Sequence, residues 1–67
     1  IFPNPANDEV NVVSSEKINQ IEIYNLTGEL MKKSTQTKIN IADFPSGIYF
    51  VKVYSETGTQ IQKLIKL

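Results

Sequence analysis

Apolar and polar residues alternate with a period of two along most of this chain of 67 residues. That period is the pattern of a β-strand with one buried face. The apolar residues are enriched in Ile, Val, Tyr and Phe, which favour pleated sheets. No stretch carries the apolar stripe of a helix, so we expect an all-β chain. The alternation predicts strands over residues 9–13, 18–25, 29–33, 38–42, 48–54 and 59–67, with residues 1–3 a candidate for a seventh.

Short turns separate these strands, and each has a local signal. In the turn over residues 26–29, Gly28 is free to adopt a positive φ. In the turn over residues 43–47, Pro45 fixes φ, and Gly47 gives the backbone conformational freedom where the chain leaves the turn. Residues 55–58 close a further hairpin. Because parallel strands need long crossover connections, such turns favour an antiparallel sandwich or small barrel. Residues 48–54 are partly apolar on both faces, which predicts a central strand.

The last strand departs from simple alternation. Ile61 and Ile65 share one phase, whereas Leu64 falls in the other and Lys63 lies between the two isoleucines. A β-bulge inserts one residue and so changes the phase of a strand. We therefore expect a bulge or a change of register near Lys63.

Size and composition exclude several classes of protein. A chain this short forms one domain, residues 1–67, and without Cys or His it lacks disulfides and the usual ligands of zinc. Seven Lys, no Arg and a formal net charge of zero argue against a nucleic-acid partner. No apolar run approaches the roughly 20 residues of a membrane span. The chain opens without a signal peptide and is expected to be a piece of a longer protein.

The residues that could carry chemistry form no convincing site. Asp8 and Glu9 are adjacent, so they point to opposite faces of a strand and make a poor acid–base pair. With Asp43 they would be weak calcium ligands, because no spaced Asp-rich loop is present. Residues 14–17 are better explained as a polar turn, and residues 25–27 match a glycosylation pattern but fit a hairpin turn. We expect no catalytic residue, no metal and no cofactor.

Several short motifs are spread over nearly the whole chain. Their residues are Pro3, Asn4, Pro5, Gly28, Gly47, Tyr49, Lys52, Gly58, Lys63, Leu64, Ile65 and Lys66. Together, in order and at these spacings, these motifs resemble the C-terminal sorting domain of the type IX secretion system, found on exported proteins of Bacteroidetes-type bacteria. Phe2 is a small departure, since the family often has Tyr before its Pro-Asn-Pro.

The resemblance implies an immunoglobulin-like antiparallel β-sandwich of about seven short strands. It also implies a sorting signal that follows an N-terminal passenger and is recognised by the outer-membrane secretion machinery. A sortase usually removes such a domain at or before its start. The resemblance further implies a location in the periplasm, in transit to the outer-membrane surface or the medium.

Three motifs have both a recognition interpretation and a structural one. Residues 3–5 form either a stiff recognition segment or a protected strand edge. Gly47 and Tyr49 are expected to be structural, with the Tyr49 hydroxyl bonded to a nearby backbone group. Residues 63–67 either add to a partner's sheet, with Lys side chains facing an acidic surface, or form an ordinary terminal strand with Lys facing water.

The main alternative function is an immunoglobulin- or fibronectin-like accessory module that binds carbohydrate or spaces domains in a surface enzyme. Carbohydrate binding would need an exposed aromatic platform, for which Tyr24, Phe50 and Tyr54 are partial candidates in a chain without Trp. A small hydrolase has no support in the sequence. Unpaired strand edges on so small a sandwich also favour strand-mediated self-association.

Overall fold

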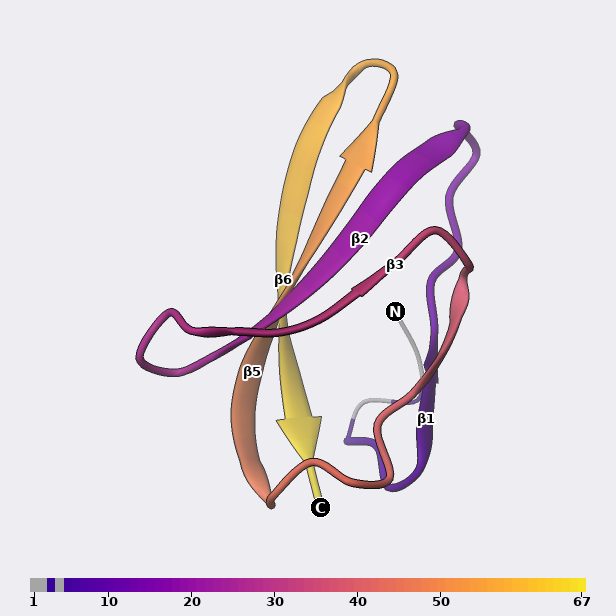
Figure 1. Cartoon of the computed structure of the whole chain (residues 1–67). Helices are drawn as coiled ribbons and strands as arrows, with labels where there is room; N and C mark the ends of the chain where they lie inside the picture. The colour runs from indigo at the N-terminus through magenta and orange to yellow at the C-terminus, as the bar shows by residue number, and fades with distance from the viewer. Residues whose placement is uncertain (1–2, 4) are drawn as a thin grey trace.

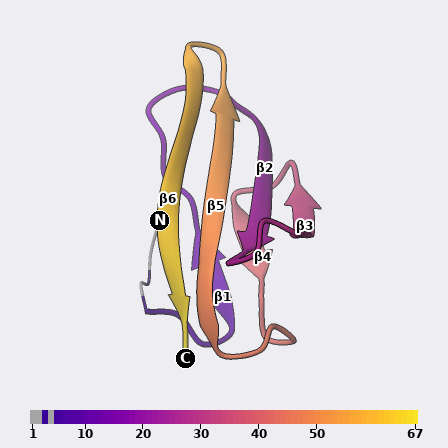
Figure 2. The same ribbon diagram turned by 90° about the vertical axis from the view of Figure 1, so that its left-hand side faces the viewer.

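The computed structural model describes residue 3 and residues 5–67, and this part of the chain folds into two antiparallel sheets of short strands (Figures 1 and 2). One sheet has the order β1-β4 and the other the order β3-β2-β5-β6. The sheets face each other as a β-sandwich, which confirms the all-β prediction. The strands are β1 (Glu9–Asn11), β2 (Ile18–Asn25), β3 (Leu30–Ser34), β4 (Lys38–Asn40), β5 (Gly47–Ser55) and β6 (Gly58–Lys66).

These bounds lie within one or two residues of the predicted ones, and β5 pairs with both β2 and β6 as expected for a central strand. The proposed strand over residues 1–3 falls mostly outside the described residues. In the described part of the chain, no helix is long and apolar enough to cross a membrane.

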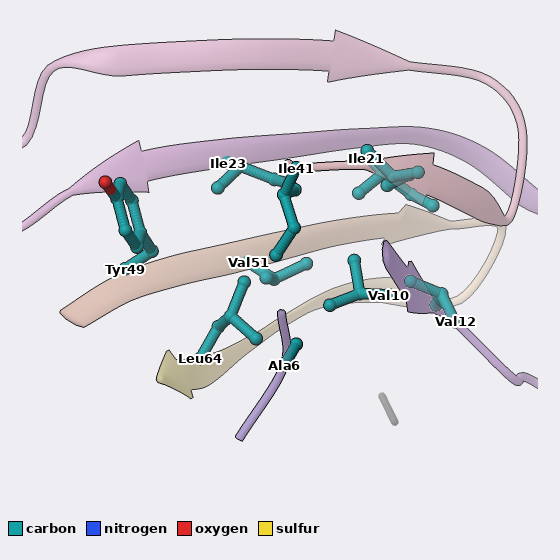
Figure 3. Close-up of a cluster of buried hydrophobic side chains, with 10 residues drawn as sticks. Ala6, Val10, Val12, Ile21, Ile23, Ile41, Tyr49, Val51 and Leu64 are labelled. Carbon is teal, nitrogen blue, oxygen red and sulfur yellow. The ribbon is translucent and has the colours of Figure 1, made fainter. Parts of the chain in front are cut away.

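The core lies between the two sheets and is made by inward-facing residues of β1, β2, β4, β5 and β6 together with Ala6, Val12 and Ile41 (Figure 3). Ile21 and Ile23 of β2, Val10 of β1 and Ile39 of β4 belong to this core, and all four side chains are almost fully buried. Alternation along these five strands therefore determines which of their side chains the sandwich buries. The buried apolar residues are Ala6, Val10, Val12, Ile21, Ile23, Ile39, Ile41, Tyr49, Val51 and Leu64.

The β2–β3 hairpin turns where the sequence predicts it. Gly28 has a φ of 90°, a conformation that L-residues with a Cβ rarely adopt. The side-chain Oδ1 of Asn25 accepts the backbone N–H of Thr27 at 3.1 Å and that of Glu29 at 2.9 Å. Residues 25–27 are thus a hairpin turn, in agreement with the prediction.

The prediction of a bulge or a change of register near Lys63 is wrong. The register of β6 against β5 runs without a shift from Gly47 opposite Lys66 to Ser55 opposite Gly58. Leu64 takes the inward phase and is fully buried, whereas Ile61 is 65% exposed on the opposite face. The phase conflict disappears because the isoleucines of β6 belong to the outer face of the sheet.

The two ends of the domain lie side by side. The backbone N–H of Ala6 donates to the carbonyl of Ile65 at 2.8 Å, and the N–H of Leu67 donates to the carbonyl of Ala6 at 2.8 Å. Ala6 and Lys66 form an isolated parallel bridge. The last residues of β6, the outermost strand of its sheet, thus pair with the segment that leads into the domain. We call this pairing of Ala6 with residues 65–67 the terminal clasp.

Candidate recognition surfaces

The terminal clasp gathers motif residues from both ends of the chain. Gly47, at the start of β5, lies opposite Lys66, which in turn bridges to Ala6. Ala6 is 1% exposed, and Lys66 is 9% exposed, with its Nζ donating to the carbonyl of Leu67 at 3.1 Å. Lys66 therefore does not face water, contrary to one interpretation of the sequence. Its buried stem supports the clasp.

Tyr49 supports the same end of the sandwich from inside. Its hydroxyl donates to the carbonyl of Pro45 at 2.6 Å, and its ring lies 5.1 Å from that of Phe44, centroid to centroid. The hydrogen bond to a nearby backbone group was expected from the sequence. It fixes the loop before Gly47, so the loop enters β5 in a defined position.

The remaining motif residues are spread over the molecule. Pro3 and Pro5 are exposed, and Asn4 lies outside the described residues. Gly28 lies in the β2–β3 turn, and Gly58 begins β6 directly after the β5–β6 turn, at the opposite end of β5 from Gly47. The motifs thus form one cluster at the terminal clasp together with separate turn positions. Lys52, Lys63 and Ile65 lie on the outer face of the four-stranded sheet, whereas Leu64 and Lys66 point inward.

This outer face, turned away from the two-stranded sheet, is the second candidate surface. Cross-strand neighbours share a face, so Leu30, Tyr24, Phe50 and Lys63 form one row across the four strands. Four exposed apolar side chains lie on this face. They are Leu30 at 44%, Ile48 at 39%, Ile61 at 65% and Ile65 at 36% exposure.

A hollow lies on this face beside the β2–β3 turn. Its floor and walls come from β2, β5, β6 and the turn, so three strands and a loop contribute to it. We call it the outer hollow. It is lined by Tyr24, Asn25, Leu26, Thr27, Gly28, Phe50, Lys52 and Ile61.

Glu22 organises the aromatic side chains next to the outer hollow. Its Oε1 accepts the hydroxyl of Tyr24 at 2.6 Å and that of Tyr54 at 2.7 Å, and its Oε2 accepts Nε2 of Gln20 at 2.9 Å. Only 8% of Glu22 is exposed. Lys52 Nζ lies 5.2 Å from the centroid of the Tyr54 ring. The carboxylate thus holds both rings by their hydroxyls.

These contacts shift the titration of the groups involved. The hydroxyls of Tyr24 and Tyr54 hold the pKa of Glu22 below its ordinary value, with smaller help from nearby lysines and against the effect of burial. The same hydrogen bond to Glu22, with burial and the carboxylate charge, raises the pKa of Tyr24 to about 12. Glu22 is therefore ionised and Tyr24 protonated at neutral pH. A carboxylate that already accepts three hydrogen bonds is a poor general base, so the cluster serves positioning rather than catalysis.

Sequence reasoning missed both Glu22 and Ala6. Glu22 shares the outer phase with Tyr24, but its contact with Tyr54 depends on the β2–β5 register. Ala6 carries no signal beyond its place after Pro5. As for metals, no three His, Cys, Asp or Glu side chains within residues 5–67 gather as a set of ligands.

A small β-sandwich with paired ends and an apolar outer face, and with no reactive cluster among its described residues, has the features of a recognition domain. The chain belongs to the family of secretion system C-terminal sorting domains, whose family model matches residues 1–67. This family is the C-terminal sorting signal of type IX secretion, which confirms the resemblance of the sequence motifs. It is a non-catalytic family that accompanies an N-terminal passenger and is handled by the secretion machinery during export across the outer membrane.

Two curated relatives come from Zobellia galactanivorans. The chain is 30% identical to beta-agarase D over 67 residues, covering 97% of this chain and 14% of the relative. It is 36% identical to beta-agarase A over 63 residues, covering 85% of this chain and 12% of the relative. The chain thus spans only a small part of the relatives that it matches.

Proposed function

We propose that the export machinery recognises this domain in its folded state and binds it at the terminal clasp. In this proposal the outer-membrane machinery binds the end of the sandwich where Ala6 meets residues 65–67. The passenger then reaches the cell surface or the medium, and a sortase cleaves the chain at or before the start of the domain.

The observation that carries the proposal is the pair of backbone hydrogen bonds between Ala6 and residues 65 and 67. They bring the segment that leads into the domain next to its last strand. A receptor that binds this end therefore contacts the C-terminal motif and the approach to the passenger together. Since Leu64 and Ala6 are both buried, the surface exists only when the sandwich is folded.

Removing residues 63–67 would be a poor test, because it takes Leu64 out of the core and unfolds the domain. Ala6→Pro is sharper, since proline lacks the N–H that donates to Ile65. Ala6→Gly is the matched control, because it keeps that N–H and loses only a methyl group. Each variant is fused behind a fluorescent passenger with a signal peptide and expressed in a bacterium with an intact type IX system.

We expect the Ala6→Pro fusion to remain in the periplasm while the Ala6→Gly fusion is exported. Thermal melting of both purified fusions verifies that the domain is still folded. Equal export of the two variants, with both folded, would show that the machinery does not recognise the terminal clasp.

The alternative of a carbohydrate-binding accessory module has less support. The hydroxyls of Tyr24 and Tyr54, which would bond sugar hydroxyls, are both directed at Glu22. Retention of the wild-type fusion in the periplasm, together with its binding to a glycan array, would favour that alternative.

We also place the expected strand-mediated self-association at β3. This strand is at one end of the strand order, whereas the end of β6 is paired with Ala6. Sedimentation of the purified fusion over a range of concentrations tests it. A sedimentation coefficient that stays constant with concentration would contradict it.

A further inference from the structure

The outer hollow is lined by the apolar side chains of Leu26, Phe50 and Ile61 and the ring of Tyr24, with Lys52 as its basic residue. We propose that it binds a protein segment of the export machinery that carries an apolar side chain flanked by carboxylates. The apolar side chain fills the hollow between Tyr24, Phe50 and Ile61. One carboxylate meets Lys52 in the lining, and another meets Lys33, which lies on β3 in the same row beyond Glu22. This inference rests on the proposed function and adds a second contact, remote from the terminal clasp.

The hollow presents apolar surface to solvent at several points. Leu26, in the turn, is 66% exposed and Ile61 is 65% exposed, while Tyr24 and Phe50 are half-buried neighbours across β2 and β5. Covering these side chains removes apolar area from water, which favours binding of an apolar group. Apolar side chains that the fold leaves uncovered on one face are typical of interaction sites.

The hollow is also preorganised. Glu22 holds the hydroxyl of Tyr24, whose ring lines the hollow, so this ring has little freedom left to lose when a ligand binds. Asn25 fixes the turn that forms one wall, through its bonds to the backbone of Thr27 and Glu29. Binding therefore needs little further ordering of the domain.

Charge determines the kind of partner. Glu22 lies between Lys33 and Lys52 in one row across β3, β2 and β5. The carboxylate keeps its charge, because the groups that donate to it are neutral, so the two lysines leave the row with an excess of one positive charge. Lys63 lies on the same face. The whole chain has a formal net charge of zero, and a face with this excess is complemented by an acidic partner.

A protein segment fits this site better than a sugar does. The side chains of Leu26, Phe50 and Ile61 offer no hydrogen bonds to hydroxyl groups, and the tyrosine hydroxyls are held by Glu22. An anionic membrane surface also combines apolar and acidic groups. The experiment must therefore distinguish binding to a membrane from binding to a protein.

Site-specific photocrosslinking during export tests the proposal. Leu26 is replaced by p-benzoylphenylalanine in the passenger fusion, and the same replacement of the exposed Thr37, before β4, is the control position. Cells are illuminated during export, and the cross-linked product is identified by mass spectrometry. We expect residue 26, and not residue 37, to cross-link to an outer-membrane component of the machinery through an acidic segment.

Charge reversal gives the matched comparison. Lys52→Glu places a negative charge at the rim of the hollow, whereas Lys38→Glu makes the same change of net charge on β4 of the other sheet. We expect the cross-link from residue 26 to fall about tenfold with Lys52→Glu and to stay at the wild-type level with Lys38→Glu. Equal cross-linking in the two variants would overturn the proposal.

Two further outcomes would also overturn it. One is binding of the purified fusion to phosphatidylglycerol vesicles that is lost with Lys52→Glu, which would assign the hollow to a membrane. The other is export of the wild-type fusion without any cross-link from residue 26, which would remove the hollow as a contact and leave the proposed function intact. Failure of the wild-type fusion to be exported would instead reject the proposed function itself.

Discussion

At the scale of single residues, Glu22 shows how neighbours change what a side chain does. By sequence it is one polar residue in an alternating strand, and we expected only that it points away from Ile21 and Ile23. In the structure it is nearly buried on the outer face and accepts hydrogen bonds from Tyr24, Tyr54 and Gln20. The alternation predicted its direction but not its partners, because these depend on the register between β2 and β5.

The coupling between Glu22 and Tyr24 gives a pH dependence of stability. The pKa of Tyr24 is raised from 10.0 to about 12 on folding, so its contribution is complete below pH 10 and is lost as the pH rises through about 12. The pKa of Glu22 is lowered from 4.5, so its contribution is present at neutral pH and is lost as the pH falls below 4.5 through its folded value. Glu22→Gln should therefore weaken both dependences.

Tyrosinate absorbance during an alkaline titration measures this directly. We expect the Tyr24 transition near pH 12 in the wild-type protein and closer to pH 10 in Glu22→Gln. Tyr24→Phe identifies the transition by removing it. A Tyr24 transition at the ordinary value in the wild-type protein would contradict the hydrogen bond.

Tyr49→Phe tests the hydrogen bond that fixes the loop before β5. The variant keeps the ring against Phe44 but loses the donor to the Pro45 carbonyl, which should lower the free energy of unfolding by about 1 kcal/mol. Urea unfolding of both proteins measures the difference. An unchanged free energy of unfolding would mean that the bond contributes nothing to stability.

At the scale of elements, the sequence predicted the strands well and the phase of one strand poorly. All six strands found among the described residues lie close to their expected positions. For β6 the sequence has apolar residues in both phases, so alternation alone cannot say which phase is buried. Pairing with β5 decides it, because Leu64 lies opposite the buried Tyr49 while Ile61 lies opposite Lys52 on the outer face.

Two alanine variants in β6 test this register. Leu64→Ala removes a fully buried side chain and should cost about 2–5 kcal/mol of unfolding free energy. Ile61→Ala trims an exposed side chain and should change it by less than about 0.5 kcal/mol. Chemical unfolding of both variants gives the comparison, and a larger loss for Ile61→Ala would mean that the phase of β6 is reversed.

At the scale of the whole molecule, the sequence motifs were sufficient to indicate the family. They did not reveal the terminal clasp, because Ala6 and Leu67 come together only when the sandwich closes. Nor did they reveal the outer hollow, which needs the registers of three strands and one turn at once. Local patterns thus predict strands and turns, whereas the surfaces that a partner would meet depend on tertiary packing.

The sorting function is tested most directly by export of a passenger that carries this domain alone. Residues 1–67 are fused to the C-terminus of a fluorescent protein with a signal peptide, and fluorescence is followed in cells with an intact type IX system and in a secretion-deficient strain. We predict fluorescence at the cell surface or in the medium, and its loss in the deficient strain. Retention of a folded fusion in the periplasm of both strains would contradict the sorting function.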